Sequence, residues 1–175
     1  MRKLVLAVGF SAAALGMGGD ALACGDKLVV VGRGRPRRVK SVQQAAILVF
    51  ADPAGVLPAA LDAGNLRKDL ERAGHRIRSV STRQELASAL GTGTYDLVMT
   101  DYKSAASVEA DARSAASHPT VLPTLYNPSA SDLAAAEKQY HCVMKAPSQQ
   151  SDYLAVVNEA LAERSKQNPA ARTSR

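Results

Sequence analysis

Short apolar runs alternate with amphipathic segments along most of this chain, from Ala45 onward. The clearest run is Ala46–Ala51, which reads AILVFA and has no polar position. A strand of this kind is typical of a parallel sheet that helices cover on both faces. Four further runs predict strands over Arg76–Val80, Asp96–Thr100, Thr120–Thr124 and Cys142–Met144.

The segments between these runs carry signals for helix ends. Thr82 and Glu85 have the spacing of a capping box, and Ser129 with Asp132 repeats it. Gly74 stands where the end of a helix favours a left-handed residue. The predicted helices are Pro58–Ala63 and Asn65–Ala73, then Thr82–Gly91, Ser104–Ser117, Ser129–Tyr140 and Gln150–Ser165.

Five strands that alternate with helices predict an α/β fold with a doubly wound, mostly parallel five-stranded sheet. Right-handed crossovers leave few topologies, and we expect the flavodoxin-like order 2-1-3-4-5. The β-branched run Lys27–Val31 predicts an additional N-terminal strand. In this order the fifth strand is an edge that needs cover, and Lys27–Val31 has the composition to supply it.

The first residues have the features of an export signal. Arg2 and Lys3 precede the apolar run Leu4–Leu15, and Ala21-Leu22-Ala23 forms a small-x-small cleavage site. We therefore expect a periplasmic or otherwise exported protein. The predicted organisation is a signal peptide over residues 1–23, an N-terminal strand and basic loop over 24–44, the α/β domain over 45–166, and a disordered tail over 167–175.

The chain carries a formal charge of +6, and much of the excess lies in one short stretch. Short charge runs usually stay hydrated, so a solvated loop is the first interpretation. Contact with an anionic envelope surface is the second. Nucleic acid is not expected, because no aromatic residues interleave the stretch for base stacking. The basic residues are Arg33, Arg35, Arg37, Arg38 and Lys40.

The two cysteines and three histidines leave several readings open. Cys24 and Cys142 form an even pair, which predicts a disulfide in an oxidising compartment. Free thiols remain an alternative, as does a lipid anchor at Cys24, which directly follows the cleavage site. The histidines show no metal-ligand spacing and are expected at the surface or in loops; they are His75, His118 and His141.

Four polar residues fall at the carboxyl ends of predicted strands: Asp52, Asp101, Thr124 and Lys145. In open α/β sheets the reactive crevice lies at this edge, so we expect these side chains to converge there. A lone Asp at a strand end can equally serve as a hydrogen-bond acceptor in a loop or as a helix cap.

Over about residues 46–165 the sequence resembles the response-regulator receiver family. In that family the first strand ends in two acids that bind Mg²⁺, and here ILVFAD gives Ala51 and Asp52. Asp101, in DLVMTD, matches the phosphate-accepting Asp, and Thr124 matches the hydroxyl that follows the phosphoryl group. Lys145-Ala146-Pro147 matches the family's Lys-Pro pair only loosely.

The resemblance implies a Mg²⁺ site formed by Asp52 and Asp101, with Lys145 as a positive charge beside the acceptor. Ala51 removes one carboxylate, so we expect at most weak Mg²⁺ binding and no other cofactor. Export would also separate the chain from ATP and cytoplasmic kinases. The leading hypothesis is therefore a non-enzymatic, exported receiver-like module that binds an unidentified envelope protein. The alternatives are a phosphoaccepting receiver and an envelope protein that binds a small ligand in the same crevice.

Overall fold

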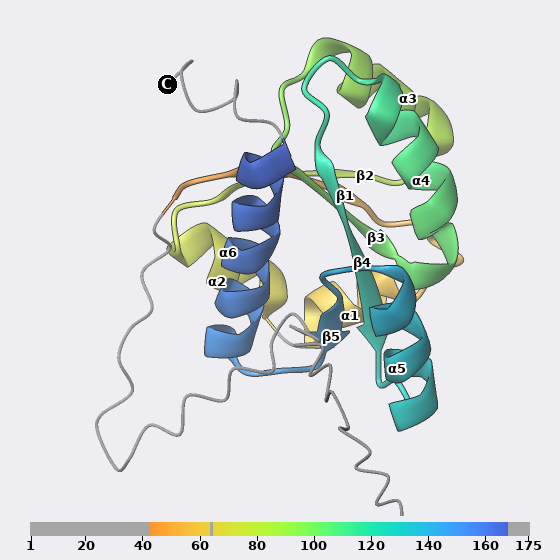
Figure 1. Cartoon of the computed structure of the whole chain (residues 1–175), viewed down its shortest axis with the longest axis vertical. Helices are drawn as coiled ribbons and strands as arrows, with labels where there is room; N and C mark the ends of the chain where they lie inside the picture. Colours follow the sequence, from red (N-terminus) through yellow and green to blue (C-terminus); the bar gives the residue numbers. More distant parts are fainter. Residues whose placement is uncertain (1–42, 64, 168–175) are drawn as a thin grey trace, which may run out of the picture.

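A five-stranded parallel sheet forms the centre of the molecule, with strand order β2-β1-β3-β4-β5 (Figure 1). The computed structural model describes residues 43–63 and 65–167. The strands are β1 (Ala46–Phe50), β2 (Arg76–Val80), β3 (Leu97–Asp101), β4 (Thr120–Tyr126) and β5 (Met144–Ala146). The predicted α/β class and the order 2-1-3-4-5 are therefore confirmed. The expected additional strand Lys27–Val31 lies outside the described residues.

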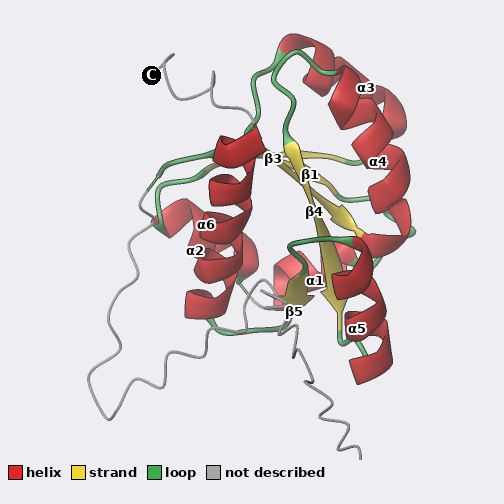
Figure 2. Cartoon of the chain, in the orientation of Figure 1, coloured by secondary structure: helices red, strands yellow, loops and turns green. Residues whose placement is uncertain are grey.

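Helices cover both faces of the sheet (Figure 2). One face carries α1 (Leu57–Ala63), α2 (Leu66–Arg72) and α6 (Gln150–Gln167), whose apolar residues join one buried cluster with β1 and β3. The other face carries α3 (Arg83–Thr92), α4 (Tyr102–Ser114) and α5 (Ala130–Gln139). No helix in the described part of the chain is both long and apolar enough to cross a bilayer.

Local signals placed most helix ends correctly. Thr82 and Glu85 form the expected capping box at α3, and Ser129 and Asp132 form the second one at α5. Gly74 follows α2 with a φ of 94°, the left-handed conformation that a glycine after a helix adopts at least cost.

Several boundaries differ from the sequence-based predictions. β3 spans Leu97–Asp101 and not Asp96–Thr100, and α4 and α6 end at Ser114 and Gln167 and not at Ser117 and Ser165. α4 begins at Tyr102 and not at Ser104, because the helix follows β3 without a loop. β4 continues past Pro123 to Tyr126. β5 spans Met144–Ala146 and not Cys142–Met144, because its pairing with β4 begins at Met144. This shift of two residues changes what lies at the end of the strand.

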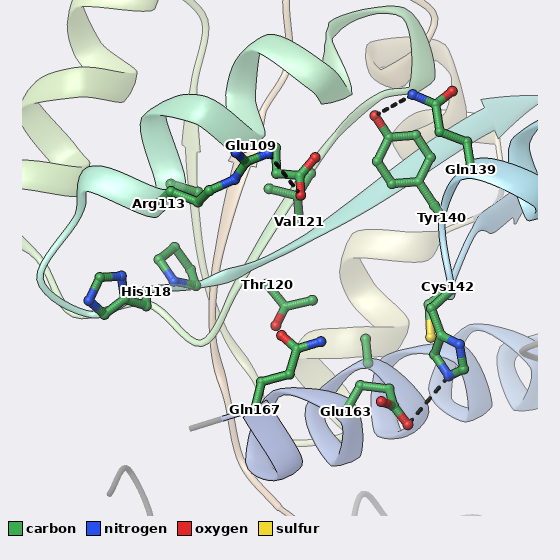
Figure 3. Close-up of a pocket in the computed structure, with 14 residues that line it drawn as sticks. Glu109, Arg113, His118, Thr120, Val121, Gln139, Tyr140, Cys142, Glu163 and Gln167 are labelled. Carbon is green, nitrogen blue, oxygen red and sulfur yellow. Dashed lines mark hydrogen bonds and ion pairs between the residues drawn. The ribbon is translucent and has the colours of Figure 1, made fainter. Parts of the chain in front are cut away.

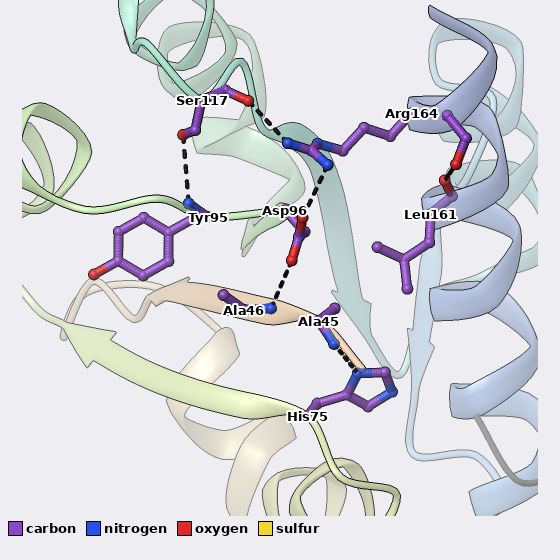
Figure 4. A network of polar contacts seen from close by, with 9 residues as sticks. Ala45, Ala46, His75, Tyr95, Asp96, Ser117, Leu161 and Arg164 are labelled. Carbon is purple, nitrogen blue, oxygen red and sulfur yellow. Dashed lines mark hydrogen bonds and ion pairs between the residues drawn. The ribbon is translucent and has the colours of Figure 1, made fainter. Parts of the chain in front are cut away.

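A buried polar network holds α6 against the amino-terminal edge of the sheet (Figure 4). Arg164 of α6 donates from Nη1 to Asp96 Oδ1 at 2.8 Å and from Nη2 to the Ser117 carbonyl at 3.0 Å. Asp96 Oδ2 accepts the backbone N–H of Ala46 at 2.8 Å. A single carboxylate therefore joins the last helix to the first strand of the sheet.

His75 belongs to the same region and corrects a prediction. It was expected at the surface or in a loop; it lies in the loop between α2 and β2, but it is buried there and not at the surface. Its Nδ1 accepts the backbone N–H of Ala45 at 3.2 Å, and burial lowers the pKa of its imidazole. An imidazole that accepts a backbone bond and is desolvated in this way stays neutral near pH 7.

Candidate functional site

The crevice at the carboxyl ends of the strands brings together three of the four predicted residues. Asp101 ends β3 and is in register with Thr124 of β4, so their α-carbons are neighbours across the two strands. Asp52 follows β1, and its charge acts on the Asp101 carboxyl. These strands were expected to meet here because all five are parallel.

Asp101 is buried and already has hydrogen-bond donors. Only 4% of the residue is exposed, and Oδ1 accepts the backbone N–H of Val56 at 2.9 Å and of Leu57 at 2.7 Å. These amides stand at the start of α1, where the first N–H groups have no partner within a helix. The carboxylate therefore serves as a cap for α1 from a strand 45 residues away.

Gly55 holds the β1–α1 loop against the same carboxylate. A β-carbon at this position would lie 1.8 Å from Asp101 Oδ2 and 2.7 Å from Cγ. The loop is turned by two bonds to Asp52, whose carbonyl accepts the N–H of Gly55 at 2.8 Å and whose Oδ1 accepts the N–H of Ala54 at 2.9 Å. A glycine is needed here for the close approach of the backbone to a side chain.

The pKa of Asp101 is raised above the ordinary value for an aspartate. Burial is the main cause, and the Asp52 carboxylate adds to it. The two backbone N–H donors and the ammonium of Lys103 act in the opposite direction. The raised pKa means that this carboxyl is more easily protonated than an exposed one, and the protonated form is the weaker nucleophile.

Two buried oxygen atoms in the crevice have no hydrogen-bond partner among the described residues: Asp101 Oδ2 and Thr124 Oγ1. Thr124 is fully buried, in the adjacent strand. Leaving a buried polar atom without a partner costs on the order of 1–3 kcal/mol. Polar atoms of this kind mark a place where the crevice can form a further hydrogen bond.

Lys145 lies apart from this group. It is exposed in the middle of β5, between Met144 and Ala146, which are both buried in the cluster beneath α6. Successive side chains of a strand point to opposite faces, so Lys145 points away from the face that carries Asp101. The cation that acts on Asp101 is Lys103, the second residue of α4, which the sequence analysis did not single out.

The donor set does not fit a magnesium ion in this arrangement. Mg²⁺ demands nearly octahedral oxygen ligands at about 2.0–2.1 Å. Ala51 contributes no carboxylate, Asp101 Oδ1 already accepts two N–H groups, and the Gly55 backbone packs against Oδ2. No phosphotransfer step through Mg²⁺ follows from this geometry.

Comparison with known proteins identifies the fold. No protein-family model matches the chain, and no curated protein matches it. The receiver domain of a sensor histidine kinase from Pseudomonas aeruginosa PAO1 superposes with a TM-score of 0.50 at 13% identity, covering 69% of this chain and 99% of that domain. A CheY-like receiver domain protein from Methanospirillum hungatei JF-1 gives a TM-score of 0.49 at 15% identity, with 71% and 99% covered. This chain has a receiver-like fold.

A receiver-like fold at such low identity fits a degenerate domain. The Pseudomonas structure is described with a magnesium ion coordinated in its active-site cleft. The ion belongs to the Pseudomonas domain.

A hollow lies at the amino-terminal end of β4, where Thr120 and Val121 line it (Figure 3). It is a groove of about 330 Å³ between α4, the first residues of β4, the α5–β5 loop and α6. β5 pairs with β4 only from Thr124 onward, so β4 enters this groove without β5 beside it. Cys142 and His141 lie in the loop that lines it.

Proposed function

We propose that this chain is an exported receiver-like domain that binds a protein partner in the bacterial envelope and does not accept a phosphoryl group. The receiver-like fold supports the first element of this proposal. Export, partner binding and the lack of phosphoryl transfer are inferred. The observation that carries the proposal is the engagement of the Asp101 carboxylate by the two N–H groups that begin α1. A phosphoacceptor needs an accessible carboxylate oxygen, whereas this carboxyl is buried, with Oδ1 bonded to two N–H groups and the Gly55 backbone against Oδ2.

Export is the second part of the proposal and is independent of the crevice. It is supported by the basic start at Arg2 and Lys3, the apolar run Leu4–Leu15 and the small-x-small site before Cys24. Intact-mass analysis of protein purified from its native host should show a chain that begins at Cys24. A full-length cytoplasmic species as the main product would refute export and favour the phosphoaccepting alternative.

A fluoride complex of beryllium, which mimics an aspartyl phosphate, tests the crevice directly. With Mg²⁺ present, a titration of the mature chain should leave the amide NMR signals near Asp101 and Thr124 unchanged. The matched variant is Ala51→Asp, which returns the missing carboxylate. A cytoplasmic receiver with both acids serves as the positive control. Saturable shifts in the wild-type chain would identify a working phosphoreceiver.

The second candidate function is binding of a small ligand in the same crevice. It is favoured by the two buried oxygens without partners, Asp101 Oδ2 and Thr124 Oγ1. Native mass spectrometry of protein from the envelope fraction should then show a bound small molecule that Thr124→Val releases. Protein that is free of ligand in this experiment would contradict the small-ligand function and would be consistent with partner binding.

A disulfide between Cys24 and Cys142 would fasten the segment after Cys24 near β5, the edge strand of the sheet. Cys142 is buried beside the groove, and Cys24 lies outside the described residues. A disulfide between them would close a loop of more than 100 residues. The loss of chain entropy in the unfolded state would then stabilise the fold by about 4–5 kcal/mol. Non-reducing peptide mapping should find the cross-linked peptide. A diacylglycerol mass on Cys24, or two free thiols after export, would contradict the bridge.

A further inference from the structure

Three side chains with metal-binding atoms lie close together beside the groove, and two of them also line it. They are His141 from the α5–β5 loop, and Glu159 and Glu163 from α6. One ligand atom from each lies within 4.8 Å of the other two. His141 Nε2 and Glu163 Oε1 are 3.3 Å apart. The histidine spacing predicted no such site, because the two glutamates follow it by 18 and 22 positions.

The helix and the loop each supply part of this geometry. Glu159 and Glu163 are four residues apart, so one turn of α6 places them on the same face. His141 reaches them from the turn that leads into β5, and half of its side chain is exposed. Donor atoms held about 2.0–2.2 Å from a tetrahedral ion lie about 3.4 Å from one another. The His141–Glu163 separation already meets this value, and rotation of the exposed Glu159 can bring its oxygen in.

We propose that His141, Glu159 and Glu163 bind a divalent transition metal, with Zn²⁺ as the representative ion. One imidazole nitrogen and two carboxylate oxygens suit zinc, whereas Mg²⁺ and Ca²⁺ prefer oxygen ligands alone. Three protein ligands leave one position of a tetrahedral ion for water or for a ligand atom from the groove. The ion would join α6 to the loop that precedes the short edge strand β5.

The charges around the three residues set how tightly the metal binds. Lys166 Nζ lies 2.5 Å from Glu163 Oε1 and competes with a metal for this carboxylate. The ammonium is largely exposed, and exposed ion pairs contribute little free energy, so a dication displaces it. On the opposite wall of the groove Arg113 is paired with Glu109, which reduces its repulsion of a cation. Glu163 is ionised near neutral pH, because the Lys166 hydrogen bond lowers its pKa.

Isothermal titration of the untagged mature chain with Zn²⁺ tests the proposal. One ion should bind per chain with a micromolar Kd, and His141→Asn should weaken it by at least about tenfold. His118→Asn is the matched control: it removes another imidazole of the same groove, and asparagine tolerates the left-handed backbone at that position. Lys166→Gln should tighten binding by removing the competing ammonium.

Three results would overturn the proposal. The first is the absence of saturable binding below millimolar Zn²⁺. The second is a loss of affinity in His118→Asn that equals or exceeds the loss in His141→Asn. The third is a thiolate charge-transfer band after Co²⁺ substitution, since that would place a cysteine, Cys24 or Cys142, in the ligand set. The site shares no residue with the crevice, so the beryllium fluoride and export experiments can fail or succeed without changing this outcome.

Discussion

Gly55→Ala tests whether the β1–α1 loop lies against Asp101. A methyl group at this position would overlap the Asp101 carboxylate, with 1.8 Å between the β-carbon and Oδ2. The carboxylate has no simple escape, because Oδ1 is held by the N–H groups of Val56 and Leu57 and the residue is buried. Either the loop must lift or the carboxylate must turn away from both donors.

The size of the effect follows from these two routes. Overpacking a filled site costs about 1–3 kcal/mol, and losing a hydrogen bond to a charged group costs about 1.5–3 kcal/mol. We expect Gly55→Ala to lower the free energy of unfolding by about 2–3 kcal/mol. For a domain of this size that corresponds to a fall in Tm of roughly 6–15 °C.

Gly91→Ala is the matched control, because a β-carbon there would meet nothing within 4 Å. This residue lies in α3, where alanine is favoured over glycine, so the control should gain about 0.5–1 kcal/mol. Both variants can be compared by thermal and urea unfolding followed by circular dichroism. In an Asp101→Ala background the Gly55→Ala cost should shrink by more than about 1 kcal/mol. A Gly55→Ala protein as stable as the Gly91→Ala protein would refute the packing of the loop on Asp101.

Three further predictions concern charged side chains. Burial raises the pKa of Asp101, so the stability linked to this carboxyl is complete below its unfolded pKa of about 4 and is lost as the pH rises through the folded pKa. Asp101→Asn should therefore have a higher Tm than the wild type near pH 7, and a Tm no higher than that of the wild type below about pH 4. A lower Tm for the variant near pH 7 would contradict this. Lys103→Ala should raise the pKa of the Asp101 carboxyl in an NMR titration and Lys145→Ala should not, and the opposite result would show that Lys145 faces the crevice. Arg164→Ala breaks a buried ion pair and should lower the free energy of unfolding by about 3 kcal/mol. Arg67→Ala breaks an exposed pair and should lower it by less than about 1 kcal/mol. Equal losses in urea titrations would show that the buried pair does not anchor the last helix.

Local and periodic features of the sequence were sufficient for the architecture. The apolar run Ala46–Ala51 predicted a strand buried on both faces, and β1 is buried throughout. The capping boxes at Thr82 and Ser129 predicted two helix starts, since each box closes within four residues. Alternation of strands and helices, with right-handed crossovers, left few topologies, and the expected one is the observed order.

The chemistry of the site depended on contacts between distant segments. Nothing near Asp101 in the sequence shows that Gly55 lies against it, or that the amides of α1 occupy its oxygen. β5 continues through Ala146, so Lys145 lies within the strand and not after it. Because neighbouring residues of a strand face opposite sides, Lys145 points away from the face that carries Asp101. His141 lies close to Glu159 and Glu163 because α6 packs beside the loop that carries His141. The residue pattern alone therefore determined which elements form along the chain, since these follow from local periodicity. The folded structure decided which side chains meet, since that depends on strand register and packing.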